Sequence, residues 1–300
     1  MENKILDVCL NQTFNYISCA TTSGFLIYQI DPFIEKKCSP FDGSLSLTHM
    51  LYTTNIVVCV GGHHVPTYKN SKYLFIWDMK DNIEICHRYC CQPIQSIQVT
   101  LSHVTVNYQD HIEVLNMNNL ESITRFGTCM FPVSKSRMYN NQSLMVYTTE
   151  KKGEIRIWKK KSMVKFKSHI SKILDIHINV KCNQIITISQ KHIKWYSVPE
   201  YDLEKCISIE HYESTVKRTM VDSGGQYILI EYKDAHMIII DKNTDMIWTI
   251  YIPDILFSSI LLKGRGLPRI FVLTKTETCV LQLRQNRMLS CISKTKYKES

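Results

Sequence analysis

The segment Ile185–Tyr196, IITISQKHIKWY, contains two short runs of β-branched and aromatic residues separated by a polar turn. Runs of this length and composition, bounded by polar breaks, predict β-strands. The second run, Ile193–Tyr196, has counterparts along the whole chain, and a polar residue follows each of them, one position later in the last counterpart. The counterparts are residues 25–28, 74–77, 112–115, 155–158, 237–240 and 279–282.

These seven predicted strands recur at a nearly constant interval. The polar residues that follow them are about 42 residues apart on average, within the ~40–45-residue repeat of a four-stranded propeller blade. A further run precedes the marked strand, as at Ile56–Val60, and another follows it, as at Ile83–Cys86, so each repeat holds four strands. The sequence therefore predicts an all-β fold, a seven-bladed WD40-like β-propeller. The polar markers are Gln29, Asp78, Asn116, Lys159, Ser197, Asp241 and Arg284.

No segment rich in Gly, Ser or Pro divides the chain, so residues 1–300 are predicted to form a single domain. A blade cannot bury both of its faces alone, so neighbouring blades must stack and the ring must close. We expect the opening strand, Ile5–Val8, to complete the last blade. A pair of β-sandwiches is the alternative, although sandwiches do not require a regular repeat.

The composition excludes several classes of protein. Hydrophobic residues make up 44% of the chain and charged residues 21%, which is typical of a globular domain rather than a disordered one. Only two alanines occur, Ala20 and Ala235, which argues against a helical bundle. Abundant Ile, Lys, Asn and Tyr indicate an AT-rich genome, such as that of a virus or a protist.

Charge and cysteine usage suggest where the protein acts. The formal net charge of +9 favours anionic partners without choosing among lipid, RNA and acidic protein. The twelve cysteines are irregularly spaced and no signal peptide opens the chain, so we expect reduced thiols and a cytoplasmic location. The longest apolar stretch, Met246–Leu262, is interrupted by Pro253 and is too short to cross a bilayer.

Two short patterns resemble WD40 signatures. They are Trp77-Asp78 and the series Ser168-His169, Ser189 and Trp195. In WD40 repeats such His, Ser and Trp side chains form a hydrogen-bonded brace within a blade. Gln190 or Lys191 replaces the turn Asp of that brace, so the resemblance implies an incomplete network here.

A more specific resemblance lies in the first two repeats and continues over most of the chain. In order and spacing, the first two repeats are similar to the PROPPIN family, seven-bladed propellers that bind phosphoinositides and act in autophagy. The resemblance thins after residue 240. The residues that carry it are Phe14, Gly24–Tyr28, Asp31–Phe33, His49–Asn55, Val60–Gly62, Pro66, Lys72–Asp78, Ser168-His169 and Ser197–Glu200.

The family's lipid site depends on a Phe-Arg-Arg-Gly motif, whose two guanidiniums grip phosphate oxygens. The matching positions here are Ile207, Ser208, Ile209 and Glu210, so both arginines are missing. Nearby Lys217 and Arg218 are candidate substitutes. The family's long membrane-entering loop of the sixth blade is replaced by the short connection Asp241–Asp245. The resemblance therefore implies weakened or lost phosphoinositide binding; the alternative is a phosphatidylinositol 3-phosphate effector with a relocated basic site.

By contrast, the second-blade loop, residues 61–72, keeps the family's character. In the family this side of the ring binds proteins such as the rod-shaped lipid-transfer protein of autophagosome growth. We therefore expect a monomeric protein-interaction scaffold that modulates autophagy; the simpler alternative is that the loop is only a surface turn. The candidate partner-binding residues are Gly61, Gly62, Pro66, Tyr68 and Lys72.

A basic strip is the strongest electrostatic feature of the sequence. It could bind an acidic peptide, RNA or an anionic membrane, or it could be a solvated rim. No aromatic residues are interleaved for base stacking, so we do not expect nucleic acid as a ligand. The strip is represented by Lys151, Lys152, Lys159, Lys160 and Lys161, within nine basic residues between 151 and 172.

Motifs for metal binding and catalysis are missing from the sequence. Cys86–Cys91, and Cys59 with His63-His64, contain metal-binding residue types without paired Cys-x-x-Cys spacing. There is no nucleophile elbow, phosphate-binding glycine loop or His-Glu-x-x-His motif. We therefore expect no metal, no cofactor and no enzymatic activity.

Overall fold

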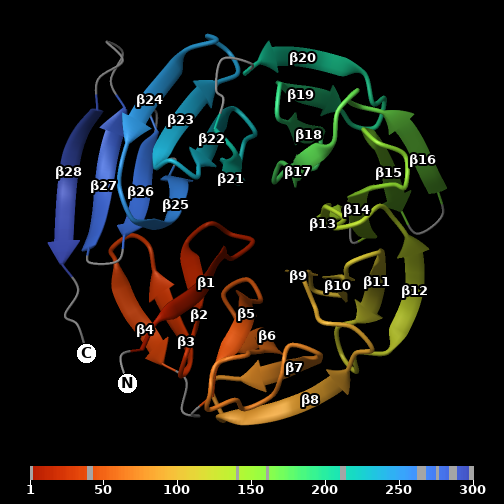
Figure 1. Ribbon diagram of the computed structural model, residues 1–300, viewed down its shortest axis with the longest axis vertical. Helices are drawn as coiled ribbons and strands as arrows, with labels where there is room; N and C mark the ends of the chain where they lie inside the picture. Colours follow the sequence, from red (N-terminus) through yellow and green to blue (C-terminus); the bar gives the residue numbers. More distant parts are fainter. Residues whose placement is uncertain are drawn as a thin grey trace. The chain divides into compact units, whose positions relative to one another are not determined.

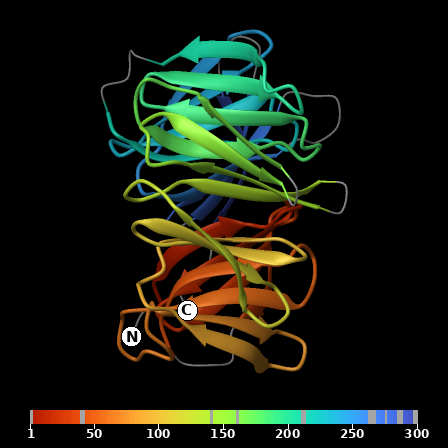
Figure 2. The ribbon, with the colours of Figure 1, turned by 90° about the vertical axis from the view of Figure 1, so that its right-hand side faces the viewer.

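The computed structural model describes residues 3–38, 43–139, 142–159, 162–209, 214–261, 268–274, 277–283 and 289–296. All regular secondary structure in these residues is β-strand, arranged as seven four-stranded antiparallel sheets (Figures 1 and 2). Seven consecutive sheets of this kind are the organisation of a seven-bladed β-propeller, which confirms the predicted fold class. None of the described residues form a helix long and apolar enough to span a membrane.

The chain divides into two compact units. The first comprises the residues up to Lys151 together with Arg156–Lys165, and the second comprises Lys152–Ile155 and the residues from Phe166 onward. Sheets are formed by strands that follow one another in the sequence, so every strand pairing is a hairpin.

The first three sheets lie in the first unit, and the fourth contributes most of its residues there. Their strands are β1 (Ile5–Leu10), β2 (Tyr16–Thr21), β3 (Gly24–Gln29), β4 (Ile34–Cys38); β5 (Leu45–Met50), β6 (Ile56–Gly61), β7 (Tyr73–Asp78), β8 (Ile83–Tyr89); β9 (Ser96–Val99), β10 (His103–Asn107), β11 (His111–Asn116), β12 (Ser122–Gly127); and β13 (Ser134–Tyr139), β14 (Gln142–Thr148), β15 (Glu154–Lys159), β16 (Ser162–Lys167).

The last three sheets belong to the second unit. Their strands are β17 (Ile173–Ile178), β18 (Gln184–Ser189), β19 (His192–Ser197), β20 (Leu203–Ser208); β21 (Val216–Val221), β22 (Tyr227–Tyr232), β23 (His236–Asp241), β24 (Ile247–Tyr251); and β25 (Ile255–Leu261), β26 (Arg269–Thr274), β27 (Glu277–Leu283), β28 (Leu289–Lys296). Every strand marked by the sequence repeat is the third strand of its sheet.

The predicted closure of the last blade by the opening strand is wrong. β1 pairs with β2 in the first sheet, with Val8 opposite Cys19, and the last sheet obtains its fourth strand from β28, paired with β27. The turn at residues 11–15 brings β1 directly beside β2, so the pairing is local. The single-domain organisation stays a prediction.

The second and third strands of the sheets form the core because both of their faces are covered. All six residues of β22 are buried, whereas the fourth strand β8 alternates between exposed and half-buried residues. Trp248 is 1% exposed and packs with Leu229 and Ile239 in an apolar cluster of the second unit. Trp248 is therefore a core residue.

The turn between β1 and β2 contacts three other sheets. Gln12 donates a hydrogen bond from Nε2 to the Val99 carbonyl at 2.9 Å, and its Oε1 accepts one from the Tyr52 main-chain N–H at 2.6 Å. The Gln12 carbonyl accepts from Arg137 at 3.2 Å, and the Arg137 guanidinium also lies over the ring of Phe14. One turn thus connects four sheets.

A brace does join Ser168 and His169, just before β17, to the fifth sheet, but with different members from those the WD40 resemblance implies. Ser168 Oγ lies 2.7 Å from Thr187 Oγ1 and 3.1 Å from the Tyr196 hydroxyl, and His169 Nε2 lies 2.9 Å from Thr187 Oγ1. Trp195 instead donates to the Gly225 carbonyl at 2.9 Å. Thr187 and Tyr196 therefore take the places expected for Ser189 and Trp195.

The protonation of His169 predicts a pH dependence of stability. Burial, together with the charge of Lys194, lowers the pKa of His169 from its usual 6.5 to about 4. Below pH 6.5 the imidazole is therefore protonated in the unfolded chain but stays neutral in the folded one. The contribution of His169 to stability is fully present above pH 6.5. As the pH falls from 6.5 towards 4, the free energy of unfolding decreases by about 1.4 kcal/mol per pH unit. Urea unfolding at a series of pH values measures this slope.

The control for this prediction is His169→Gln, which keeps a side-chain amide able to bond Thr187 but has no titratable group. Between pH 6.5 and 4, we expect the free energy of unfolding of the variant to fall less steeply with pH, by the contribution of about one proton. An unchanged slope would show that other groups cause the acid sensitivity.

Candidate functional site

The positions that match the family's lipid motif lie in and just after β20. Ile207 and Ile209 are both buried, and they pack in one apolar cluster with Trp195 and Ile238. Ser208, between them, is exposed because alternate residues of a strand point to opposite faces. Glu210 lies outside the described residues. The described motif positions therefore offer no cation to a phosphate group.

The two candidate substitutes occupy β21, where a bulge separates Val216 from Arg218. Lys217 donates to the Ile255 carbonyl at 2.6 Å, and Arg218 donates to the Leu256 carbonyl at 2.9 Å. The Arg218 guanidinium also lies 5.5 Å from the ring centre of Phe257. Both cations thus hold the chain that enters β25.

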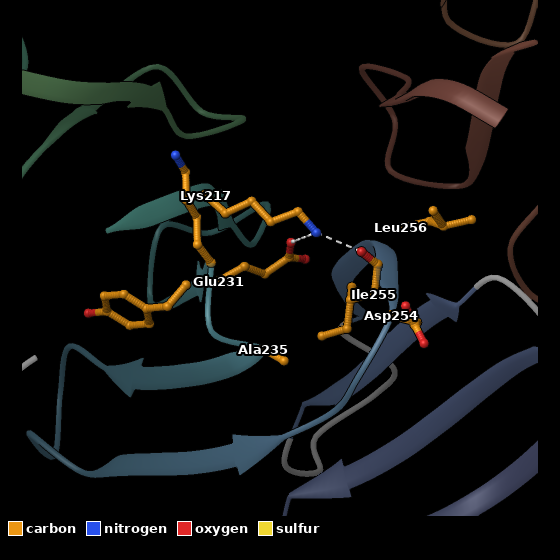
Figure 3. A pocket seen from close by; sticks show the side chains of 8 residues that line it. Lys217, Glu231, Ala235, Asp254, Ile255 and Leu256 are labelled. Carbon is orange, nitrogen blue, oxygen red and sulfur yellow. Dashed lines mark hydrogen bonds and ion pairs between the residues drawn. The ribbon is translucent and has the colours of Figure 1, made fainter. Parts of the chain in front are cut away.

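A pocket of about 350 Å³ lies beside Lys217 in the second unit (Figure 3). Figure 3 shows the Lys217 ammonium between the Glu231 carboxylate and the Ile255 carbonyl. Lys233 and Asp254 also line the pocket, so its lining includes two lysines and two acidic residues. This balance of charge opposes a doubly charged phosphate group.

The connection between β23 and β24 is a compact turn. Asp241 accepts hydrogen bonds from the Asn243 N–H at 2.9 Å and the Thr244 hydroxyl at 3.0 Å, and Asp245 N–H donates to the Asp241 carbonyl at 3.0 Å. Lys242 forms an ion pair with Glu204 at 2.7 Å. The turn has no apolar residue to insert into a membrane.

The second-blade loop is held close to the residues before β5. Ser44 N–H donates to the Pro66 carbonyl, and Gly62 N–H donates to the Ser44 carbonyl, each at 2.9 Å. A Cβ atom at Gly61 would lie 2.0 Å from the Lys69 carbonyl oxygen, so only glycine fits there. The glycines and Pro66 therefore shape this loop. The Lys72 main chain connects the loop end to Cys90 through a 2.8 Å hydrogen bond.

Glu84 in β8 anchors the centre of the loop. Its carboxylate accepts hydrogen bonds from Lys69 at 2.5 and 2.6 Å and from the Tyr68 hydroxyl at 3.1 Å, and His87 Nδ1 lies 2.6 Å away. The Lys69 ammonium also lies 5.2 Å from the ring centre of Phe75. Burial alone would raise the pKa of Glu84, but the hydrogen bonds from Lys69 and His87 outweigh burial and hold this pKa below its usual value.

Glu84, Lys69 and His87 were not predicted from the sequence as site residues. Glu84 is an acid at a half-buried position of a strand whose neighbours Ile83 and Ile85 are exposed, which reverses the usual pattern. Nothing in the sequence signalled the anchor, because the alternation of Ile83, Glu84 and Ile85 predicts that the isoleucines are the buried residues.

We expect Glu84→Gln to loosen the second-blade loop. The variant loses the charge that holds Lys69, so trypsin should cleave after Lys69 and Lys72 about five times faster, corresponding to ~1 kcal/mol for a partly buried pair. Mass spectrometry of a digestion time course locates the cuts. Glu204→Gln, which breaks the Lys242 pair elsewhere, is the matched control; equal cleavage of the loop in both variants would contradict the anchor.

The basic strip is only partly described. Lys151 and Lys152 are exposed and Lys159 is half-buried, whereas Lys160 and Lys161 lie outside the described residues. Cys59 is buried in the core while His63 and His64 are exposed. Within the described part of the chain, no three His, Cys, Asp or Glu side chains are grouped to hold a metal ion.

The comparisons with curated proteins give partial matches. No family model matches the chain. Autophagy-related protein 18 of Yarrowia lipolytica is 27% identical over 151 residues, which are 48% of this chain and 37% of that protein. SVP1-like protein 2 of Schizosaccharomyces pombe is 39% identical over 72 residues, 24% of this chain and 20% of that protein. The matched region is thus about a third or less of each relative's length.

Solved structures match over nearly the whole chain. Hsv2 of Kluyvelomyces marxianus has a TM-score of 0.81 at 18% identity, covering 98% of this chain and 99% of that one. Atg21, in a complex with the coiled coil of Atg16, has a TM-score of 0.77 at 16% identity, covering 99% and 100%. These likenesses show the fold. The relatives are Atg18 and SVP1-like proteins and the structural neighbours are Hsv2 and Atg21 propellers, so the chain resembles the PROPPIN propellers, in sequence over part of its length and in fold over nearly all of it.

Proposed function

We propose that this chain is a non-enzymatic protein-interaction scaffold that modulates autophagy from the cytoplasm, with phosphoinositide binding weakened or lost. Its curated relatives are autophagy-related proteins, which supports the process. The complex of the neighbour Atg21 with an Atg16 coiled coil supports an autophagy protein as partner.

The observation that supports the loss of lipid binding is that the nearby cations, Lys217 and Arg218, are already hydrogen-bonded within the protein. Phosphate recognition by arginine depends on a free fork of N–H donors. Ile207 and Ile209 supply only buried apolar surface, and Lys217 and Arg218 spend hydrogen bonds on main-chain carbonyls. A headgroup would have to compete with these carbonyls.

The second-blade loop supports the proposed binding of a protein partner. Its main chain is fixed by Ser44 and its side chains by Glu84, so little conformational freedom is lost when a partner binds. Val65, at the tip, is 83% exposed and available for contact. The partner we propose is the rod-shaped lipid-transfer protein of autophagosome growth.

The pocket beside Lys217 favours one competing function, a phosphatidylinositol 3-phosphate effector with a relocated basic site. Lys217 and Lys233 both line this pocket. Glu231 and Asp254 line it as well, and they cancel the positive charge that an inositol phosphate needs.

Liposome flotation separates the two functions. Vesicles with and without phosphatidylinositol 3-phosphate should recover equal, small amounts of protein. Lipid-dependent recovery that is lost in the double variant Lys217→Gln, Arg218→Gln but kept in Lys181→Gln, an exposed lysine on another turn, would establish the effector instead.

The partner half is tested by co-precipitation with the lipid-transfer protein. Tyr68→Ala with Lys72→Glu should abolish recovery, whereas Lys151→Glu with Lys152→Glu should not. The reverse pattern would assign binding to the basic strip and overturn the loop as the docking site.

A further inference from the structure

The pocket beside β21 has a buried acid at its base. The Glu231 side chain is 1% exposed, and its Oε1 accepts a hydrogen bond from the Ser258 hydroxyl. Within the described part of the chain, Oε2 has no hydrogen-bond donor. The Lys217 ammonium is 4.0 Å from Oε2, beyond hydrogen-bond distance, because its bond is made to the Ile255 carbonyl.

A buried acceptor without a donor is costly, so a ligand that donates to it recovers free energy. Lys217 can make room for such a ligand, since its side chain is 41% exposed and only its tip is fixed. The base of the pocket therefore selects a group with N–H donors and positive charge, such as a primary ammonium.

The rim of the pocket selects an anionic group as well. Lys233 is exposed at the pocket edge, and the Lys217 ammonium is within reach of the same space. A simple cation would be repelled by these two lysines, and a polyanion would be repelled by Glu231 and Asp254. A molecule with one charge of each sign matches all four groups.

We propose that this pocket binds a small zwitterion, a molecule whose primary ammonium is a few bonds away from a carboxylate or phosphate group. The ammonium donates to Glu231 Oε2, and the anionic group lies between Lys217 and Lys233. The site requires neither a membrane nor a protein partner, so it is independent of the scaffold function.

Calorimetric titration with a graded series tests the proposal. The probes are glycine, γ-aminobutyrate, ε-aminocaproate and phosphoethanolamine, which vary the spacing and the type of anion; butylamine, butyrate and the soluble inositol headgroup of phosphatidylinositol 3-phosphate are the controls. We expect saturable binding of at least one zwitterion and none of the controls. Binding of phosphoethanolamine alone would assign the anion to phosphate, and binding of the amino acids would assign it to carboxylate.

Three variants locate the binding. Glu231→Gln should weaken it about tenfold or more, because a charged hydrogen bond is lost. Lys233→Gln, on the exposed rim, should weaken it about fivefold without affecting folding, and Lys181→Gln should leave it unchanged. Far-UV circular dichroism checks that each variant is folded. The proposal is overturned if no zwitterion binds, if the inositol headgroup binds instead, or if Lys233→Gln and Lys181→Gln behave alike.

Discussion

Replacing Glu113 with alanine is expected to lower the free energy of unfolding by about 3–5 kcal/mol. Glu113 is buried in β11, and its carboxylate receives Arg88 at 3.0 Å and the Tyr108 hydroxyl at 3.2 Å. Arg88 also donates to the Leu120 carbonyl at 2.9 Å, so it cannot leave without breaking a second bond. Alanine would leave the partly buried Arg88 guanidinium and the buried Tyr108 hydroxyl without this acceptor.

Urea unfolding followed by circular dichroism measures this loss. The matched control is Arg125→Ala, which removes a partner of the same carboxylate at 3.6 Å whose side chain is 58% exposed. An exposed partner contributes about 0–1 kcal/mol. Similar losses in both variants would show that burial of the Glu113 network does not stabilise the protein.

The second large effect is expected from restoring an arginine of the lipid motif. Ile209→Arg places a guanidinium in the apolar cluster of Trp195 and Ile238, where no carboxylate belongs to the cluster, and should destabilise the protein by about 3 kcal/mol or more. Ser208→Arg, at the exposed position beside it, should change stability by about 0.5 kcal/mol or less.

Thermal unfolding of the two variants side by side provides the measurement. Flotation of Ser208→Arg with phosphatidylinositol 3-phosphate should show no gain, because a single guanidinium lacks the second fork. If Ile209→Arg were as stable as the unmodified protein, the apolar cluster would be able to accommodate an arginine of the motif. The loss of lipid binding would then have another cause.

The repeat of the third strands was predictable because these strands are buried on both faces and therefore appear as continuous apolar runs. β1 was assigned to the wrong sheet because a run such as Ile5–Val8 predicts a strand without identifying its partner. The brace was misassigned for a similar reason: Trp195 and Tyr196 point to opposite faces, and sequence alone does not say which face carries the bonds.

The site residues also divide into features that the sequence predicted and features that it did not. Missing arginines and a short sixth-blade connection were visible in the sequence. The engagement of Lys217 and Arg218 was not, because their acceptors are main-chain carbonyls 38 residues away, and carbonyls have no sequence signature. Glu84 and Lys69 are 15 residues apart, and only the folded loop brings them together.

The bonds of Gln12 also set an order of events during synthesis. Its three hydrogen-bond partners, Tyr52, Val99 and Arg137, lie 40, 87 and 125 residues further along the chain. At a translation rate of ~5–20 residues per second, Arg137 leaves the ribosome roughly 6–25 s after Gln12. The first hairpin therefore emerges early, but the turn at Gln12 forms its last hydrogen bond only when the fourth sheet begins to form. The part of these four sheets that is synthesised first is thus the part where their assembly is completed.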